Sequence, residues 1–192
     1  MAIQHTIFIS TDRLKRDTAL GGSVDDNILF PYILMAQDRY ILPVLGTDLQ
    51  DKLISDIQGS SLSGAYLTLL QKFVQPALTQ FAFATVLPFL RLRMVNNSVV
   101  TMNTEQGTSV SHEELKPLIN ASMDQGEFYR KRLIDYLTGN TASFSEYSTN
   151  QTNEGDVVPN AQTYYAGLNL DVAPLSNKEK AFITGAGITI LC

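Results

Sequence analysis

Residues that could support catalysis are few in this chain of 192 residues, and they do not cluster. The two histidines are His5 and His112, and His112 stands beside Glu113 and Glu114. His112 could ligate a metal ion, but no second histidine or cysteine follows at a ligand spacing. A Ser-His-Asp site would need one of these histidines, and the Gly-x-Ser-x-Gly signature is absent.

The glycines give an equally weak signal of chemistry. Gly185–Gly187 has the spacing of the first two glycines of a dinucleotide fingerprint, but Ile190 occupies the place of the third. The Walker pattern is absent, and the single cysteine, Cys192, has no partner for a disulfide or a metal site. We therefore predict a protein that is not an enzyme and that holds neither a metal nor a cofactor.

Charged residues are explained more simply by helix electrostatics than by acid–base chemistry. The pairs Asp25–Asp26 and Glu113–Glu114 come at expected helix starts, where the helix dipole favours negative charge. Arg91 and Arg93 could contact phosphate or a partner's carboxylate, although two solvated arginines are the default interpretation.

Composition permits one domain with a core and disfavours tight binding of nucleic acid. The chain is 44% hydrophobic and only 17% charged, and its net charge is −5. An acidic balance opposes phosphate neutralisation, although a mildly acidic wall would let a DNA duplex slide past. No signal peptide is visible, and we interpret the uncharged stretch Phe73–Leu90 as a buried helix rather than a membrane span.

Helical segments with caps and apolar stripes occupy the chain up to Leu137. The segment after Ser23 has a broad apolar arc that predicts a well-buried helix to about Tyr40, with a kink at Pro31. The other helices expected before residue 92 are Asp12–Asp17 after a Ser10 cap, one from Thr47 to about Ile57, and a central one over Ala65–Arg91 in two pieces joined at Gln75–Pro76.

The last and longest helix has one continuous stripe. The capping box Ser111–Glu114 opens it, and Gly139 is a suitable residue to end it. Small residues at Ser122 and Gly126, in the middle of the stripe, would allow close approach of another helix. The stripe consists of Leu115, Ile119, Ser122, Gly126, Tyr129, Leu133 and Tyr136.

Between the central and the last helix, the pattern changes to that of strands. Val99–Thr101 and Thr108–Val110 flank the turn signal Glu105–Gly107, which predicts a β-hairpin near residues 98–110, with Asn96–Asn97 as an alternative turn. A lone hairpin is marginal in water, so one that projects from a helical domain usually packs on something else.

Residues 139–192 lack a sustained period and are rich in Ser, Thr, Asn, Gln and Gly. We predict a helical domain over residues 1–138 and an extended C-terminal arm over residues 139–192. Such arms often wrap a neighbouring chain, because ordering them requires contact from outside. Tyr147, Tyr164 and Tyr165 are either interface anchors or residues that fold back on their own domain.

In the residue types and the order of several short stretches, the chain resembles a family of small virion proteins from tailed phages of Bacteroidetes, including crAss-like phages. The stretches that carry this resemblance lie between about residues 7 and 137. They are Ile9–Thr18, Gly21–Gly22, Ile41–Leu49, Gln75–Leu78, Ser98–Val100 and Glu127–Leu137.

The resemblance implies a head–tail connector (adaptor) subunit that forms a ring, typically of twelve copies, below the portal protein of the virion. It implies a mainly α fold, with a helical bundle, an inserted β-hairpin and a long extended C-terminal arm. Expected partners are other copies of the chain, the portal protein and an adjacent tail or stopper protein, while DNA passes through the lumen without sequence-specific binding. By that likeness, the arm contacts a partner through Tyr164, Tyr165, Leu168, Phe182, Ile183, Ile188 and Ile190.

Two alternatives remain at the level of the sequence. One is another virion ring, such as a tail-completion or stopper protein, which needs the same interfaces. The other is a small helical enzyme or ligand-binding protein that uses the uncharged centre around Phe81–Phe89. The leading expectation places the protein in the virion, at the head–tail interface and away from membranes, after synthesis in the host cytoplasm.

Overall fold

The computed structural model describes residues 5–21, 24–90, 92–95, 98–101, 112–149 and 156–160. All of them belong to one unit of the chain, which extends from Met1 to Ala161. Helices predominate in the described part, so the expectation of a mainly α fold is confirmed. In chain order, the elements are α1 (Thr11–Asp17), α2 (Asp26–Ala36), η1 (Gln37–Ile41), α3 (Leu42–Leu45), α4 (Thr47–Gln58), α5 (Gly64–Leu69), η2 (Leu70–Val74), α6 (Gln75–Leu90), β1 (Leu92–Val95), β2 (Ser98–Thr101), α7 (His112–Gly139), η3 (Thr141–Ser143) and α8 (Ser145–Thr149).

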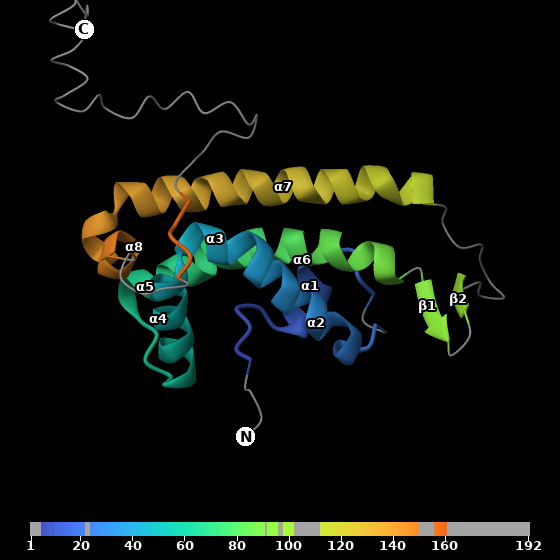
Figure 1. The fold of residues 1–192 in the computed structure, drawn as a ribbon, viewed down its shortest axis with the longest axis horizontal. Helices are drawn as coiled ribbons and strands as arrows, with labels where there is room; N and C mark the ends of the chain where they lie inside the picture. The colour runs from blue at the N-terminus through green and yellow to red at the C-terminus, as the bar shows by residue number, and fades with distance from the viewer. Residues whose placement is uncertain are drawn as a thin grey trace, which may run out of the picture. The chain divides into compact units, whose positions relative to one another are not determined.

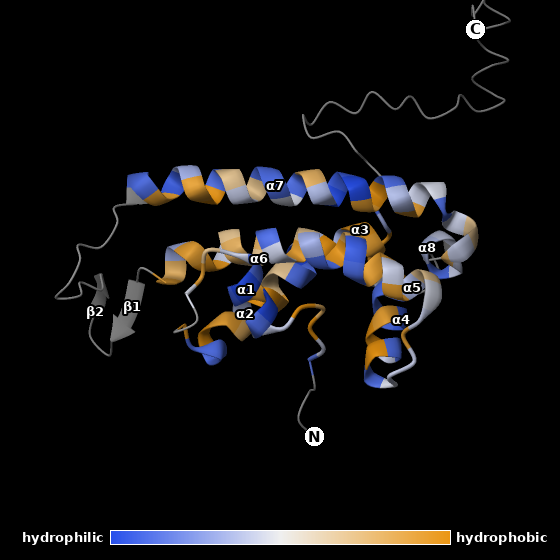
Figure 2. Cartoon of the chain, turned by 180° about the vertical axis from the view of Figure 1, so that it is seen from behind, coloured by the Kyte–Doolittle hydropathy of each residue, from blue (hydrophilic) through white to orange (hydrophobic). Residues whose placement is uncertain are grey.

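Helix α6 lies at the centre, with α7 along one side and α1 and α2 on the other (Figure 1). The sequence explains this position, because α6 is apolar nearly all the way round, as a helix surrounded by neighbours must be. Figure 2 shows the same contrast as mostly apolar colour on α6 and mixed colour on α7. The three-and-four-residue spacing of Leu70, Val74, Leu78 and Phe81 predicts a core stripe on this helix, and all four residues are buried.

The close crossing expected between α7 and another helix is also present. Ser122 and Gly126 are buried, and a Cβ atom added at Gly126 would lie 2.7 Å from Cε1 of Phe81 on α6. The ring of Phe81 is fully buried and stacks on Tyr40, with 4.3 Å between the ring centroids. The absent side chain at Gly126 therefore makes room for the fully buried ring of Phe81.

Two π-helical turns precede prolines. Turn η1 ends two residues before Pro43, and η2 ends two residues before Pro76. A proline lacks the backbone N–H, and its ring crowds the carbonyl four residues earlier, which a locally widened turn accommodates. The break expected at Gln75–Pro76 is thus a change from π-helical to α-helical geometry. A π-helical turn, η1, also follows α2, and Pro31, where the sequence predicts a kink, lies inside α2.

The structure shows the N-caps of α1 and α2, while the expected cap Ser111 lies outside the described residues. The Ser10 hydroxyl accepts a hydrogen bond from the backbone N–H of Arg13 at 3.1 Å, which confirms it as the N-cap of α1. The sequence predicts Ser23 as the cap of α2, but the cap is Asp25, because its carboxylate accepts a hydrogen bond from the backbone N–H of Asn27 at 2.9 Å.

Helix α2 is buried on one side only, so the expectation of a well-buried helix is wrong for its other face. Leu29, Ile33 and Ala36 are fully buried against the core. Ile28 and Met35 are each 47% exposed.

The stretches Asp26–Leu45 and Gly64–Leu90 are long and apolar enough to cross a membrane by length and composition alone. In the most apolar 18-residue part of each stretch, 39% is buried inside the fold for Asp26–Leu45 and 56% for Gly64–Leu90. The interpretation of Phe73–Leu90 as a core helix agrees with the burial of α6.

Strands β1 and β2 pair antiparallel, with Leu92 opposite Thr101 and Val95 opposite Ser98. The paired segments flank Asn96–Asn97, the alternative turn position. The turn Glu105–Gly107 and the strand Thr108–Val110 lie outside the described residues, so the hairpin expected near residues 98–110 stays a prediction.

The helical unit continues beyond the boundary expected at residue 138. After α7, the chain turns through η3 into α8, and Phe144 and Tyr147 are buried in the core. Residues 156–160 return to the unit as well, with hydrogen bonds to Pro43 and Thr47. The described residues of the expected arm therefore fold back on their own domain, because Phe144 and Tyr147 are buried in its core and residues 156–160 bond to it.

Candidate interaction surfaces

The seven residues expected to contact a partner fall outside the described residues. They are Tyr164, Tyr165, Leu168, Phe182, Ile183, Ile188 and Ile190. Of the three arm tyrosines, Tyr147 is described, and its 9% exposure agrees with the alternative that it folds back on its own domain.

The described residues contain no group of three or more His, Cys, Asp or Glu side chains that could hold a metal ion. His5 is exposed ahead of α1, and His112 is the first residue of α7.

The segment Asp156–Asn160 is attached to the corner between α3 and α4. The backbone N–H of Val157 donates to the hydroxyl of Thr47 at 2.8 Å, and the backbone N–H of Thr47 donates to the carbonyl of Val157 at 3.1 Å. The backbone N–H of Asn160 donates to the carbonyl of Pro43 at 2.7 Å.

This attachment provides a hydrogen-bond acceptor for the first turn of α4, which has no side-chain cap. The N-cap of α4 is Gly46, which has no side chain to accept a hydrogen bond from the first turn. The carbonyl of Val157 accepts one of these unpaired donors instead. The segment is therefore anchored to the helical unit as far as Asn160.

Replacing Thr47 with valine should loosen this attachment without changing the shape of the side chain. The backbone N–H of Val157 would lose its acceptor, which costs about 1 kcal/mol in the free energy of unfolding. Hydrogen exchange at Val157 and Asn160 should become faster. Thr68→Val, which removes a hydroxyl that bonds only to Gly64 within its own helix, is the matched control. Unchanged exchange at both amides would show that this hydrogen bond does not hold the segment.

An aromatic cluster and one partly buried side-chain hydrogen bond hold α8 and the turn before it against the rest of the helical unit. The ring of Phe144 packs edge-on against Tyr66, with 5.3 Å between the centroids, and against Tyr136 at 5.9 Å. The hydroxyl of Tyr66 donates to the Glu146 carboxylate at 2.7 Å, and the ammonium of Lys52 lies 5.6 Å from the centre of the Tyr66 ring. These contacts tie α8 to α4 and α5.

Replacing Tyr66 with phenylalanine should cost about 1 kcal/mol at neutral pH, because the hydrogen bond to Glu146 is lost. Burial, followed by that hydrogen bond, raises the pKa of Tyr66 to about 12 from an ordinary value of 10.0. This raised pKa contributes stability that is present below pH 10 and is lost as the pH rises through about 12. The stability difference between wild type and Tyr66→Phe should therefore narrow as the pH rises from about 10 towards 12 in denaturant titrations.

Tyr129→Phe is the control, because the Tyr129 hydroxyl makes no hydrogen bond within the described residues. A difference between wild type and Tyr66→Phe that stays constant over this pH range would contradict the account.

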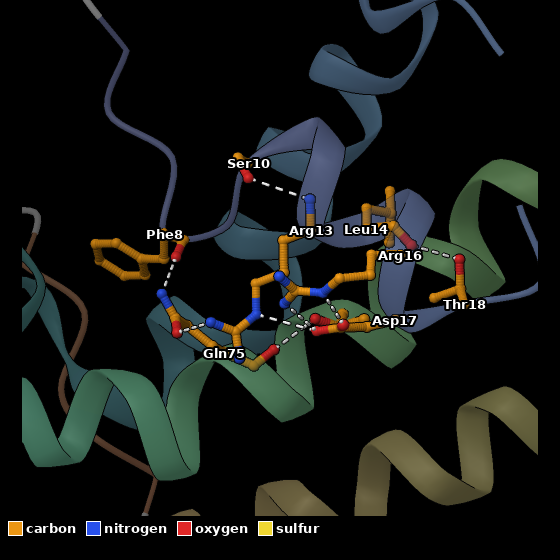
Figure 3. Close-up of polar contacts among 9 residues, drawn as sticks. Phe8, Ser10, Arg13, Leu14, Arg16, Asp17, Thr18 and Gln75 are labelled. Carbon is orange, nitrogen blue, oxygen red and sulfur yellow. Dashed lines mark hydrogen bonds and ion pairs between the residues drawn. The ribbon is translucent and has the colours of Figure 1, made fainter. Parts of the chain in front are cut away.

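A polar cluster joins the N-terminal segment to α6 (Figure 3). The guanidinium of Arg13 donates to the Gln75 side-chain carbonyl, and the Gln75 amide donates to the carbonyl of Phe8 at 2.8 Å. Asp17 accepts from Arg16 at 2.8 Å, and it lies 3.2 Å from Nε of Arg13 in an ion pair without hydrogen-bond alignment. A hollow of about 200 Å³ adjoins the cluster. The three charged residues all lie on α1, and the hydrogen bonds of Gln75 to Arg13 and Phe8 are the polar contacts that join this part of the chain to α6.

Large apolar side chains are exposed on the outside of the bundle. On α2 they are Ile28, Phe30 and Met35, and on α7 they are Leu118 and Phe128; Phe89 and Val158 are also exposed. Contiguous exposed apolar surface commonly marks a site of protein–protein contact. Sequence reasoning missed these residues, although α7 contains a second three-and-four-residue spacing beside its core stripe that could have indicated them.

The comparisons with known proteins give one family and no named relative. The model of a family of unknown function, DUF6712, matches residues 41–157. No curated protein and no solved structure matches the chain.

Proposed function

This chain belongs to DUF6712, a family of unknown function, and on that premise we propose that it is a structural subunit of a phage virion, a head–tail connector that forms a ring below the portal protein. The family match covers α3 to α8 and thus the greater part of the helical unit. The observation that carries the proposal is the exposure of large apolar side chains on α2 and α7, which an assembled ring would cover.

Two further features support an assembly role. Residues 156–160 are attached at the α3–α4 corner, so the chain is anchored to the helical unit as far as Asn160. The net charge of −5 fits a ring through which DNA passes without being held.

The proposal includes the finer features of the architecture. The hairpin near residues 98–110 projects toward a neighbouring subunit, and the arm beyond residue 160 reaches the portal or the next copy. In the arm, the contacts are those expected from the resemblance: Tyr164, Tyr165, Leu168, Phe182, Ile183, Ile188 and Ile190.

The proposal is tested by binding to the portal protein of the same virus. The full chain should co-elute with the portal in a fixed ratio, and a chain that ends at Asn160 should stay folded but bind at least tenfold more weakly. Binding to a tail or stopper protein instead would favour the other virion ring. A full chain that binds neither and stays monomeric would overturn the proposal.

A further inference from the structure

Helix α7 carries a second stripe beside its core stripe, rotated about 100° round the helix axis because each of its residues immediately precedes a residue of the core stripe. Leu118, Ala121, Gln125, Phe128 and Arg132 recur at intervals of three and four residues, and all five are exposed. Leu118 is 41% exposed and Phe128 is 56% exposed. Since residues at this spacing lie on one side of a helix, the stripe is a continuous surface along α7.

Arg132 ends this stripe on a platform of aromatic rings. Its guanidinium carbon lies 5.8 Å from the ring centres of Phe73 and Tyr129 and 5.9 Å from that of Phe128. Arg132 has no ion pair among the described residues, so its donors are free to meet a carboxylate. An arginine held on aromatic rings is a frequent centre of a protein–protein contact.

Helix α2 and the start of η1 carry a matching stripe. Ile28, Pro31, Met35 and Asp38 recur at intervals of three and four residues, and all four are exposed. The carboxylate of Asp38 has no ion pair within the part of the chain that the structure describes. The α2 stripe therefore consists of three apolar residues followed by a carboxylate, whereas the α7 stripe ends in an arginine, a charge of the opposite sign.

The two stripes fit each other in spacing. Ile28 and Met35 are seven residues apart, as are Ala121 and Phe128, which is about 10.5 Å at 1.5 Å per residue. Asp38 follows Met35 by three residues, and Arg132 follows Phe128 by four. Aligned in parallel, the stripes place Ile28 opposite Ala121, Met35 opposite Phe128 and Asp38 opposite Arg132. Pro31 then lies opposite the polar side chain of Gln125.

The stripes belong to helices on different sides of α6 (Figure 1). One chain therefore offers them as two separate faces, which is the arrangement that a head-to-tail ring requires. We propose that the α2 stripe of one copy packs on the α7 stripe of the next copy, with an ion pair between Asp38 and Arg132 at the contact. This inference rests on the proposed function, since it specifies the interface of the proposed ring.

Single cysteines test the contact in the full chain. In a Cys192→Ser background, one chain carries Met35→Cys and another carries Phe128→Cys; both positions are exposed, so neither change should disturb the fold. After assembly, alone or with the portal, a short bis-maleimide should give cross-linked dimers only in the mixture of the two chains. A chain with both cysteines should give a ladder. Asp51→Cys replaces Met35→Cys in the control mixture, because Asp51 is exposed on α4.

Dimers from Phe128→Cys alone, or equal yields in the control mixture, would overturn the proposed contact. An assembled ring without the Met35–Phe128 cross-link would also overturn it, while the proposed function would stand. A chain that assembles neither alone nor with the portal would overturn both.

A charge exchange gives a second readout in the cysteine pair. Arg132→Glu should reduce the yield of the cross-link about tenfold, because two carboxylates would then face each other. Adding Asp38→Lys to the partner chain should restore the yield. If Arg132→Glu alone and Asp38→Lys alone each leave the yield of the cross-link unchanged, Asp38 and Arg132 do not meet, and the proposed alignment is wrong.

Discussion

Replacing Gly126 with leucine should lower the free energy of unfolding by about 3 kcal/mol, the upper part of the range for overpacked cores. A Cβ atom at this position would lie 2.7 Å from Cε1 and 2.8 Å from Cδ1 of Phe81. The ring cannot move aside cheaply, because it is fully buried and stacked at 4.3 Å on Tyr40. The gain in helix propensity on replacing glycine, about 1 kcal/mol at most, does not offset this clash.

Gly139 supplies the control, because a Cβ atom there would have nothing within 4 Å. Gly139→Leu should leave the denaturant midpoint almost unchanged, whereas Gly126→Leu should lower it clearly. A second variant, Gly126→Leu with Phe81→Leu, should recover part of the loss by making room. Equal midpoints for the two glycine variants would show that α6 and α7 do not cross closely at Gly126.

Replacing Phe144 with alanine should cost about 3–5 kcal/mol, the range for a buried phenylalanine. Its ring is fully buried beyond the end of α7 and packs edge-on against Tyr66 and Tyr136. A loss of this size would show that the segment after residue 138 is part of the core. Thermal and denaturant unfolding of the full chain would measure it.

Phe128→Ala is the matched control, because Phe128 is 56% exposed and its truncation opens no cavity. Truncation gives an independent check. A chain that ends at Asn160 should keep its melting temperature, and one that ends at Thr138 should lose several degrees or fail to fold. Equal stability of the two truncated chains would restore the boundary at residue 138.

The inner architecture follows from the sequence because its signals are periodic. The stripe through Leu70, Val74, Leu78 and Phe81 predicts the central helix, and the small residue Gly126 predicts the close crossing with α7. Both depend on local spacing and residue size, which the sequence displays directly.

The fold-back after α7 could not be predicted in the same way. Gly139 and the polar residues after it indicate the end of a domain, and α8 has only five residues, too few to display a period. Phe144 and Tyr147 look like isolated apolar residues in a linker until the tertiary structure brings α4 and α5 beside them. Their burial depends on non-local packing.

The outward stripes were missed for a different reason. Helix α2 is apolar over a broad arc, so its pattern does not reveal that Leu29 faces the core and Ile28 faces outward. The stripe through Phe128 is interrupted by Gln125 and ends in Arg132, which resembles an ordinary solvated face. The structure distinguishes the faces because it supplies the neighbours.

The central claim is that this chain is a ring subunit that joins a portal. The most direct test is the mass of the complex by light scattering, with the full chain measured alone and with the portal protein. The account predicts a closed oligomer or a fixed ratio of subunits to the portal, with the mass unchanged at higher protein concentration. A mass that stays that of one 21.2 kDa chain in both samples would contradict it.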